Sequence, residues 1–246
     1  MLPMIEPIDL LRASLEAGKG VLRPPTQGAG PPLASRPAPV LVPIRTLSVR
    51  HRQRVLRHLT ALEPHDRYLR FGFPANDVQI QSYVDSLNFE RDEIFGIYNR
   101  RLELLAMAHL AFTVEPGLTT CAEFGVSVLK AARGRGYGAH LFERAVMSAR
   151  NAGVSRLFIH ALSENTAMLK IATNAGATVE RDGAESEAHL NLEPANLDSQ
   201  LSEMVAEQMA QADYRIKVQV KQFWDLLAEM QGIRRGLQDV MGSDPK

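Results

Sequence analysis

The feature that most constrains this chain is a glycine-rich turn at residues 133–138, which reads Arg-Gly-Arg-Gly-Tyr-Gly. It follows an apolar run from Phe124 to Leu129 and opens a segment with the apolar spacing of a helix, residues 136–152. Glycine lets the backbone turn tightly and lets a ligand approach it closely. Because a helix N-terminus leaves N–H groups unpaired and carries partial positive charge, a strand, a glycine turn and a helix start together favour an anion, most often phosphate.

Two common phosphate-binding patterns do not fit this turn. A P-loop requires Gly-Lys followed by Ser or Thr, and the chain has no such triplet. Gly134, Gly136 and Ala139 match the dinucleotide fingerprint G-x-G-x-x-A, which also needs an acidic residue about 20 positions further on, at the end of the next strand. No acid closes the expected next strand, residues 156–160, and Glu164 follows about 30 residues after Gly134, so the spacing is wrong.

A third pattern, Arg/Gln-x-x-Gly-x-Gly/Ala, is filled in register by Arg133, Gly136 and Gly138. It resembles the acyl-CoA pyrophosphate loop of the GNAT N-acetyltransferase superfamily. Residues 122–128 resemble the fourth strand of that family, and Glu123 stands ten positions before Arg133, as in many members.

The resemblance extends over roughly residues 40–193. Residues 164–169 and 174–176 resemble the family's last helix, which packs near the pantetheine and thiol end of the cofactor. Residues 66–71, Asp-Arg-Tyr-Leu-Arg-Phe, resemble a segment of bacterial protein-lysine acetyltransferase domains. Within the superfamily, the chain therefore resembles these domains most.

Apolar periodicity predicts an α/β (α+β) fold with the order β-α-α-β-β-β-α-β-α-β-β. The expected strands are residues 40–47, 92–99, 102–114, 119–129, 156–160, 177–181 and 188–192, and the expected helices are residues 49–62, 77–87, 136–152 and 165–175. This is also the element order of the GNAT fold. The resemblance therefore implies a mixed central sheet of six to seven strands flanked by helices.

Composition divides the chain into three parts. Residues 1–40 hold eight of the fourteen prolines, and we expect residues 1–39 to form a flexible, disordered arm. Residues 40–195 form the expected GNAT acetyltransferase domain. Residues 196–246 carry the pattern of one long amphipathic helix. Two hypotheses stay open for it: a coiled coil that joins two subunits into a homodimer, or a helix folded against its own domain.

The charge and cysteine content exclude several classes of protein. With 28 basic and 28 acidic residues, the chain has no overall attraction to nucleic acid or to an anionic membrane. The single cysteine, Cys121, rules out an internal disulfide framework and fits a reducing compartment. The apolar run 104–114 is too short to span a bilayer, and no targeting segment is apparent, so the prediction is a soluble cytoplasmic protein. No spacing typical of metal ligands is present.

The resemblance also implies roles for individual residues. Transfer of an acyl group to an amine needs a neutral amine, and Glu123 is the candidate base that would take its proton; the alternative for Glu123 is a solvated or ion-paired strand residue. The implied acyl-CoA contacts are Val126, Ser127 and Val128 for the pantetheine arm, Arg133, Gly134, Arg135, Gly136, Tyr137, Gly138 and Ala139 for the pyrophosphate, and Asn165 for the pantetheine or its ordered water. Asn165 also suits a simple helix cap.

We therefore expect an acetyl-CoA-dependent N-acetyltransferase, with acetyl-CoA as cosubstrate and no metal. The acceptor is a primary amine, either a protein lysine or a small amine. One departure from the family pattern favours another hypothesis: Ala172 stands where many members have a tyrosine that protonates the leaving thiol. The alternative function is a non-catalytic acyl-CoA-binding sensor.

Overall fold

The computed structural model describes residues 42–113 and 121–241, with the backbone alone given for residues 197–199, 223–224 and 226–241. The chain divides into two units, Met1–Val40 and Leu41–Lys246, and all described residues belong to the second. The predicted flexible arm and the turn at residues 114–120 lie outside the described residues.

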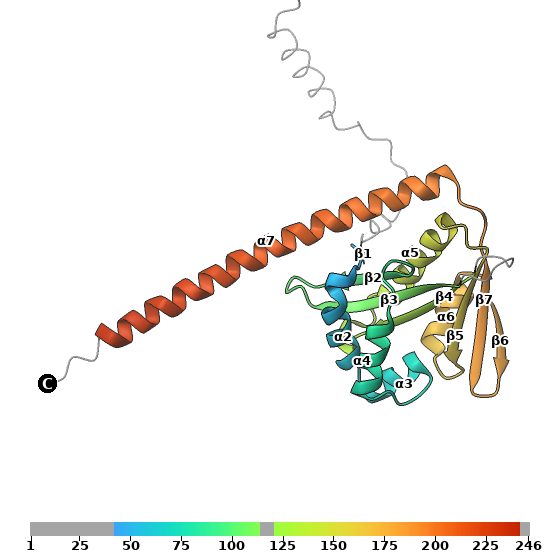
Figure 1. Cartoon of the computed structure of the whole chain (residues 1–246), viewed down its shortest axis with the longest axis horizontal. Coiled ribbons are helices and arrows are strands. Elements are labelled where there is room, and N and C mark those ends of the chain that lie inside the picture. The colour runs from blue at the N-terminus through green and yellow to red at the C-terminus, as the bar shows by residue number, and fades with distance from the viewer. Residues whose placement is uncertain (1–41, 114–120, 242–246) are drawn as a thin grey trace, which may run out of the picture. The chain divides into compact units, whose positions relative to one another are not determined.

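One mixed sheet of seven strands, in the order β1-β2-β3-β4-β5-β7-β6, forms the centre of the second unit (Figure 1). The strands are β1 Arg45–Thr46, β2 Glu93–Tyr98, β3 Leu104–Thr113, β4 Cys121–Val128, β5 Arg156–Leu162, β6 Thr178–Asp182 and β7 Glu185–Asn191. Only β4 and β5 pair in parallel, and every other neighbouring pair is antiparallel. The predicted fold class and the predicted order of strands are confirmed.

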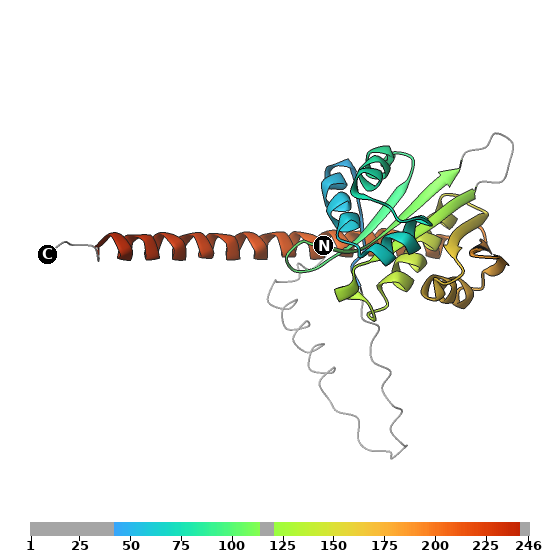
Figure 2. The same cartoon turned by 90° about the horizontal axis from the view of Figure 1, so that it is seen from below.

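Helices cover both faces of the sheet (Figures 1 and 2). They are α2 Arg52–Thr60, α3 Pro64–Phe71, α4 Asp77–Ser86, α5 Tyr137–Asn151, α6 Thr166–Asn174 and α7 Leu197–Met241, with short 3-10 turns η1 Val49–His51 and η2 Lys130–Ala132. Strand residues alternate between two cores. Phe95 and Ile97 pack toward α5 and α6, whereas Ile94 and Tyr98 pack toward α2 and α4.

Two local predictions differ from the structure. Strand β1 has only two residues, although apolar spacing predicted a strand over residues 40–47; Pro43 cannot donate a ladder hydrogen bond. Helix α3 was not predicted, yet its end signals are in the sequence. Pro64 occupies its first turn, and Gly72 follows its last residue with a left-handed φ of 78°.

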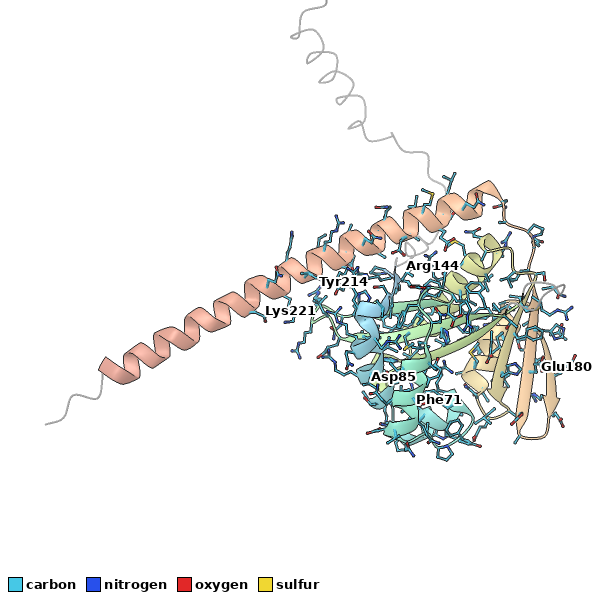
Figure 3. All side chains as sticks on the ribbon, in the orientation of Figure 1. Phe71, Asp85, Arg144, Glu180, Tyr214 and Lys221 are labelled. Carbon is cyan, nitrogen blue, oxygen red and sulfur yellow. The ribbon has the colours of Figure 1, made fainter. Side chains whose placement is uncertain are left out.

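The first half of α7 packs on the domain beside β1 and α5 (Figure 3). The buried Arg144 of α5 pairs with Glu203 at 2.8 Å and with Glu207 at 3.5 Å. The hydroxyl of Thr46 in β1 also donates to Glu207, at 2.9 Å. The predicted C-terminal helix is therefore present, and these contacts agree with the folded-back arrangement for its first turns.

Part of α7 faces away from these contacts. Its exposed large apolar side chains are Leu201, Met204, Val205, Met209, Ile216 and Val220. The coiled coil and the homodimer stay predictions. Among the described residues, no helix combines the length and the apolar character needed to cross a membrane.

Candidate active site

Strands β4 and β5 separate halfway along their length. Their parallel pairing begins at Cys121 with Arg156 and stops at Glu123 with Phe158, although β4 runs on to Val128 and β5 to Leu162. Strand β4 continues to pair with β3 as far as Val128. The sheet is therefore continuous on one side of β4 and open on the other, starting at Glu123.

The phase of the β3–β4 ladder decides which amides face this opening. In an antiparallel pair, residues alternate between hydrogen-bonded and non-hydrogen-bonded positions. The N–H of Leu129 donates to the Leu105 carbonyl at 2.9 Å, which makes the position opposite Leu105 a hydrogen-bonded one. It follows that Val126 and Val128 direct their N–H groups toward the side that β5 has left, while the N–H of Ser127 points toward β3.

The side chain of Ser127 also lies away from the opening. It is buried under α2, where its hydroxyl lies 2.9 Å from Nε2 of His58. Nδ1 of His58 lies 2.8 Å from the Leu104 carbonyl. Since a carbonyl can only accept, Nδ1 carries the proton and Nε2 accepts from Ser127. This pair fixes β4 to α2, and burial lowers the pKa of His58 to about 4.

The glycine turn begins α5 without a side-chain cap. Gly134 and Gly136 have φ values of 74° and 76°, in the left-handed region that other residues avoid. Gly136 is the N-cap and offers no side chain, and the first donor inside the helix is His140, to the Gly136 carbonyl at 3.0 Å. The N–H groups of Tyr137, Gly138 and Ala139 precede that bond, so they remain available to an anion.

Gly138 has a separate packing role. A Cβ built on it would lie 3.1 Å from Cδ1 of Ile171, so the start of α5 approaches α6 at a distance that leaves little room for a side chain. The glycine turn therefore packs closely against α6. Val128, at the end of β4, also lies near Gly138.

Arg133 forms an ion pair with another residue of this chain. Its guanidinium pairs with Asp66 of α3, a carboxylate that is 8% exposed and whose Oδ2 has no hydrogen-bond partner among the described residues. The pairing joins the glycine turn to α3. Arg135 is exposed as well, and it forms no ion pair with another described residue.

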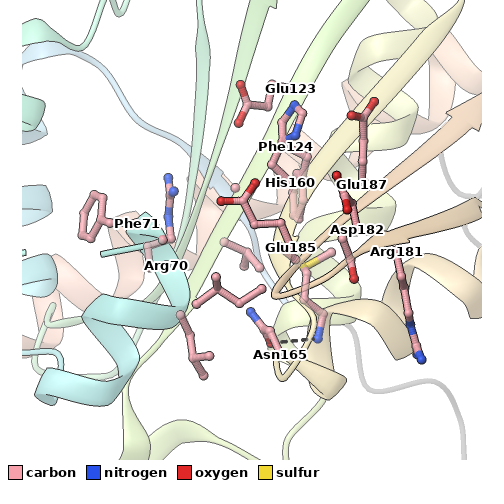
Figure 4. A pocket seen from close by; sticks show the side chains of 18 of the residues that line it. Arg70, Phe71, Glu123, Phe124, His160, Asn165, Arg181, Asp182, Glu185 and Glu187 are labelled. Atoms are coloured by element: carbon pink, nitrogen blue, oxygen red, sulfur yellow. Dashed lines mark hydrogen bonds between the residues drawn. The ribbon is translucent and has the colours of Figure 1, made fainter. Parts of the chain in front are cut away.

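A pocket of about 690 Å³ lies beside the separation of β4 and β5 (Figure 4). Its walls come from α3, β4, β5, α6 and the β6–β7 hairpin. Of the predicted site residues, Glu123, Val126 and Asn165 line it, whereas the glycine turn does not. The charged lining residues are Arg70, Glu123, Glu180, Arg181, Asp182, Glu185 and Glu187, so carboxylates outnumber arginines by five to two.

Asn165 caps α6, which is one of the two roles that the sequence suggested, and its contact with the pantetheine stays a prediction. Its side chain accepts from the N–H of Met168 at 3.1 Å, which caps α6, and it also lines the pocket (Figure 4). Ala172, further along α6, is fully buried in the core. A methyl group at that position has no proton to give to a leaving thiolate.

The sequence did not single out a role for Arg70, whose guanidinium lies directly over β4. A Cβ built on Gly125 would lie 2.6 Å from Nη2 of Arg70, so only glycine leaves room for it. Arg70 donates to the hydroxyl of Tyr83 at 2.9 Å, and that hydroxyl lies 2.9 Å from Nδ1 of His109. The family-like segment 66–71 was the only sequence signal for this residue.

Asp92 completes this chain of hydrogen bonds, 3.2 Å from Nε2 of His109. Burial lowers the pKa of His109. Burial alone would raise the pKa of Asp92, but hydrogen bonds from Arg91 and His109 hold it below its usual value. Buried groups that satisfy one another in this way form a rigid support, which here fixes Arg70 in the pocket wall.

Comparison with known proteins identifies the domain. Residues 60–176 match the model of the acetyltransferase (GNAT) family. This match confirms the predicted resemblance to the GNAT superfamily over residues 60–176. No curated protein sequence matches the chain.

Two solved structures share the fold at low identity, and a third is less similar. The GNAT domain of S. lividans PAT is 21% identical, with 61% of this chain and 89% of that chain covered and a TM-score of 0.52. A candidate acetyltransferase from Acinetobacter baylyi is 17% identical, with coverage of 62% and 94% and a TM-score of 0.51. Spermidine N-acetyltransferase from Vibrio cholerae, solved with CoA and spermine, is 14% identical, with coverage of 60% and 94% and a TM-score of 0.48.

The backbone of the glycine turn gives a first prediction. Gly136→Ala places a residue with a Cβ in a left-handed backbone conformation, which costs about 1–2 kcal/mol. We expect the turn to shift and the affinity for CoA, measured by calorimetry, to fall roughly tenfold, because 1.4 kcal/mol is a factor of ten in Kd. Gly153→Ala is the matched control, since Gly153 has a φ of 78° but ends α5 at its other end. Equal affinity in the two variants would contradict the role of the turn.

The buried imidazole gives a second prediction. The pKa of His58 is lowered from 6.5 to about 4, so the unfolded chain binds a proton in this range before the folded one does. The free energy of unfolding should therefore fall as the pH drops from 6.5 toward 4. His58→Gln should flatten this dependence in urea titrations, whereas His65→Gln, at an exposed position, should leave it unchanged. An identical slope in the His58 variant would contradict the assignment.

Proposed function

We propose that the chain is an N-acetyltransferase that moves the acetyl group of acetyl-CoA directly to a primary amine. The observation that carries the proposal is the separation of β4 from β5 beside the glycine turn. It supplies two amides on an open strand edge, next to a helix start with free N–H groups. A long amide-bearing ligand that ends in a pyrophosphate has complementary groups in the same order.

The proposed cofactor contacts follow from this geometry. The N–H groups of Val126 and Val128 would bind the pantetheine arm, as a neighbouring strand would. The N–H groups that precede His140 in the turn would bind the pyrophosphate, favoured by the helix dipole. Since Arg133 is paired with Asp66, its part in this proposal is to hold the turn in place rather than to contact the phosphates.

Glu123 is the proposed base. It is the last β4 residue paired with β5, it is exposed, and it lines the pocket. A lysine or alkylamine has a pKa near 10.4, so it is mostly protonated at neutral pH and needs to lose a proton before attack. The amine nitrogen then attacks the thioester carbon, the C–N bond forms, and the C–S bond breaks to release CoA.

The leaving group needs little help. A CoA thiol resembles cysteine, whose pKa is near 8.5, so the thiolate is a stable leaving group and solvent can protonate it. This accounts for catalysis with alanine at position 172. A backbone N–H of β4 would polarise the acetyl carbonyl, as amides do for other developing oxyanions.

The charge of the pocket favours a cationic acceptor. Glu180 is directly opposite Glu187 in the β6–β7 hairpin, and Asp182 is opposite Glu185. Like charges in facing positions destabilise a hairpin. None of the four forms an ion pair with another described residue. An amine that carries positive charge, on a small molecule or at a protein lysine, would relieve this repulsion.

The alternative is an acyl-CoA-binding sensor, which Ala172 favours because a general acid is missing there. The two differ in one observable. An enzyme releases free thiol from acetyl-CoA only when an amine is added, whereas a sensor binds acetyl-CoA without that release.

Substitution of the base tests the proposal. Glu123→Gln should lower kcat roughly 100- to 10,000-fold at neutral pH while leaving the Kd of acetyl-CoA unchanged. The loss of kcat should become smaller as the pH rises toward the pKa of the acceptor amine, because the amine then loses its proton unaided. Glu90→Gln, at an exposed site outside the pocket, is the control. Unchanged turnover of the Glu123 variant at both neutral and alkaline pH would contradict the proposal.

The acidic hairpin gives a separate prediction. Glu180→Gln combined with Glu187→Gln should raise the KM for a polyamine or a lysine-rich peptide severalfold without changing the KM for acetyl-CoA. It should also raise thermal stability slightly, because it removes a like-charge pair. An unchanged KM, compared with a Glu90→Gln control, would show that these carboxylates do not face the acceptor.

A further inference from the structure

A second cavity, of about 540 Å³, lies between α7 and the first described residues of the chain. It is formed where α7 passes β1 and η1, and its lining combines residues 45–48 and 50 with residues of α7 between 207 and 219. Sites for small molecules and cofactors fall in the range of about 300–1,000 Å³. The cavity therefore has the volume of a ligand site and shares no lining residue with the pocket at Glu123.

Its charge is predominantly positive. Arg45, Arg50 and Arg215 line it, and none of them forms an ion pair with another described residue. The lining contains one carboxylate, Glu207, which already accepts from Thr46 and lies 3.5 Å from Arg144. Three guanidinium groups thus meet at a cavity without an anion of their own.

The positive charge of these arginines also acts on His51 in η1. The pKa of His51 is lowered from 6.5 to about 4, mainly by burial and in addition by the charges of Arg45, Arg50 and Arg54. Positive charge thus extends beyond the cavity wall into η1.

Arg45 is held in place before any ligand arrives. Its guanidinium stacks 3.7 Å over the ring of Tyr214, which packs edge-on against Tyr98 at 5.5 Å between centroids. The Tyr214 hydroxyl accepts a hydrogen bond from Arg54. Nη1 of Arg45 is buried with no hydrogen-bond partner in the described structure. A fixed guanidinium with unused donors loses little freedom when an anion binds.

We propose that this cavity binds a phosphorylated small molecule, with its phosphate held by Arg45, Arg50 and Arg215. Several guanidinium groups match the several oxygens and the double charge of a phosphate better than they match a single carboxylate. The cavity is larger than a phosphate, and its remaining polar lining, Ser48, Gln211 and Gln219, suits a hydroxyl-bearing remainder.

The ligand would join α7 to the sheet. Arg45 belongs to β1 and Arg50 to η1, whereas Arg215 belongs to α7. One bound phosphate would therefore contact both α7 and the segment that begins the sheet. Binding should therefore slow amide hydrogen exchange in α7 around residues 209–219, because it stabilises the packed state of this segment.

The test is a calorimetric titration of the full chain with inorganic phosphate, ribose phosphate and adenosine monophosphate, at constant ionic strength. Arg50→Ala and Arg215→Ala, both at exposed positions, should each weaken binding roughly tenfold, the scale of one charge-assisted hydrogen bond. Arg101→Ala, an exposed arginine in the β2–β3 turn, should leave it unchanged. Tighter binding of the phosphate esters than of inorganic phosphate would identify an organic ligand, and equal binding would identify phosphate itself.

Two results would overturn the proposal. One is the absence of saturable binding of all three probes at millimolar concentration. The other is binding that the double variant Arg50→Ala/Arg215→Ala leaves unchanged, since the phosphate would then occupy the glycine turn at α5. Neither readout involves acetyl transfer, so failure here has no bearing on the proposed function.

Discussion

The end of hydrogen bonding between β4 and β5 at Glu123 is the constraint on which the rest of the site depends. A paired strand has no spare amides, whereas β4 beyond Glu123 is bonded on one side only. The open edge leaves Val126 and Val128 with outward N–H groups and makes room for the pocket. It also exposes Glu123 at the point where the two strands part. In the proposed function, this one interruption of the sheet would supply both a groove for the cofactor and the position of the base.

The surrounding structure keeps this interruption open. His58 and Ser127 fix β4 to α2, and Arg70 of α3 lies over Gly125 on the same face of the strand. The Asp66–Arg133 pair ties the same helix α3 to the glycine turn. Because α3 contacts both β4 and the glycine turn, a shift of this helix would move the pocket wall and the turn together. We infer that α3 aligns the two halves of the site.

The sequence predicted the features that depend on local pattern. The glycine turn, the helix that follows it, the cap at Asn165 and the strand order all follow from residue type and spacing, and the structure has them. The family resemblance pointed to Glu123, which lies where β4 and β5 separate. What local pattern could not give are contacts between distant segments. Ser127 faces His58, 69 positions away, and Arg133 faces Asp66, so neither pairing is visible as spacing. Helix α3 had clear end signals, but eight residues are too few for a periodic pattern.

The most direct test of the account measures amide hydrogen exchange with and without acetyl-CoA. The open edge of β4 and the start of α5 should both be affected, since the ligand would accept hydrogen bonds from their N–H groups. We predict slower exchange at Val126, Val128 and residues 137–139, and no change at Ser127, whose N–H is already bonded within the sheet. Acetyl-CoA binding without protection at Val126 and Val128 would contradict the central claim that the open edge of β4 holds the cofactor.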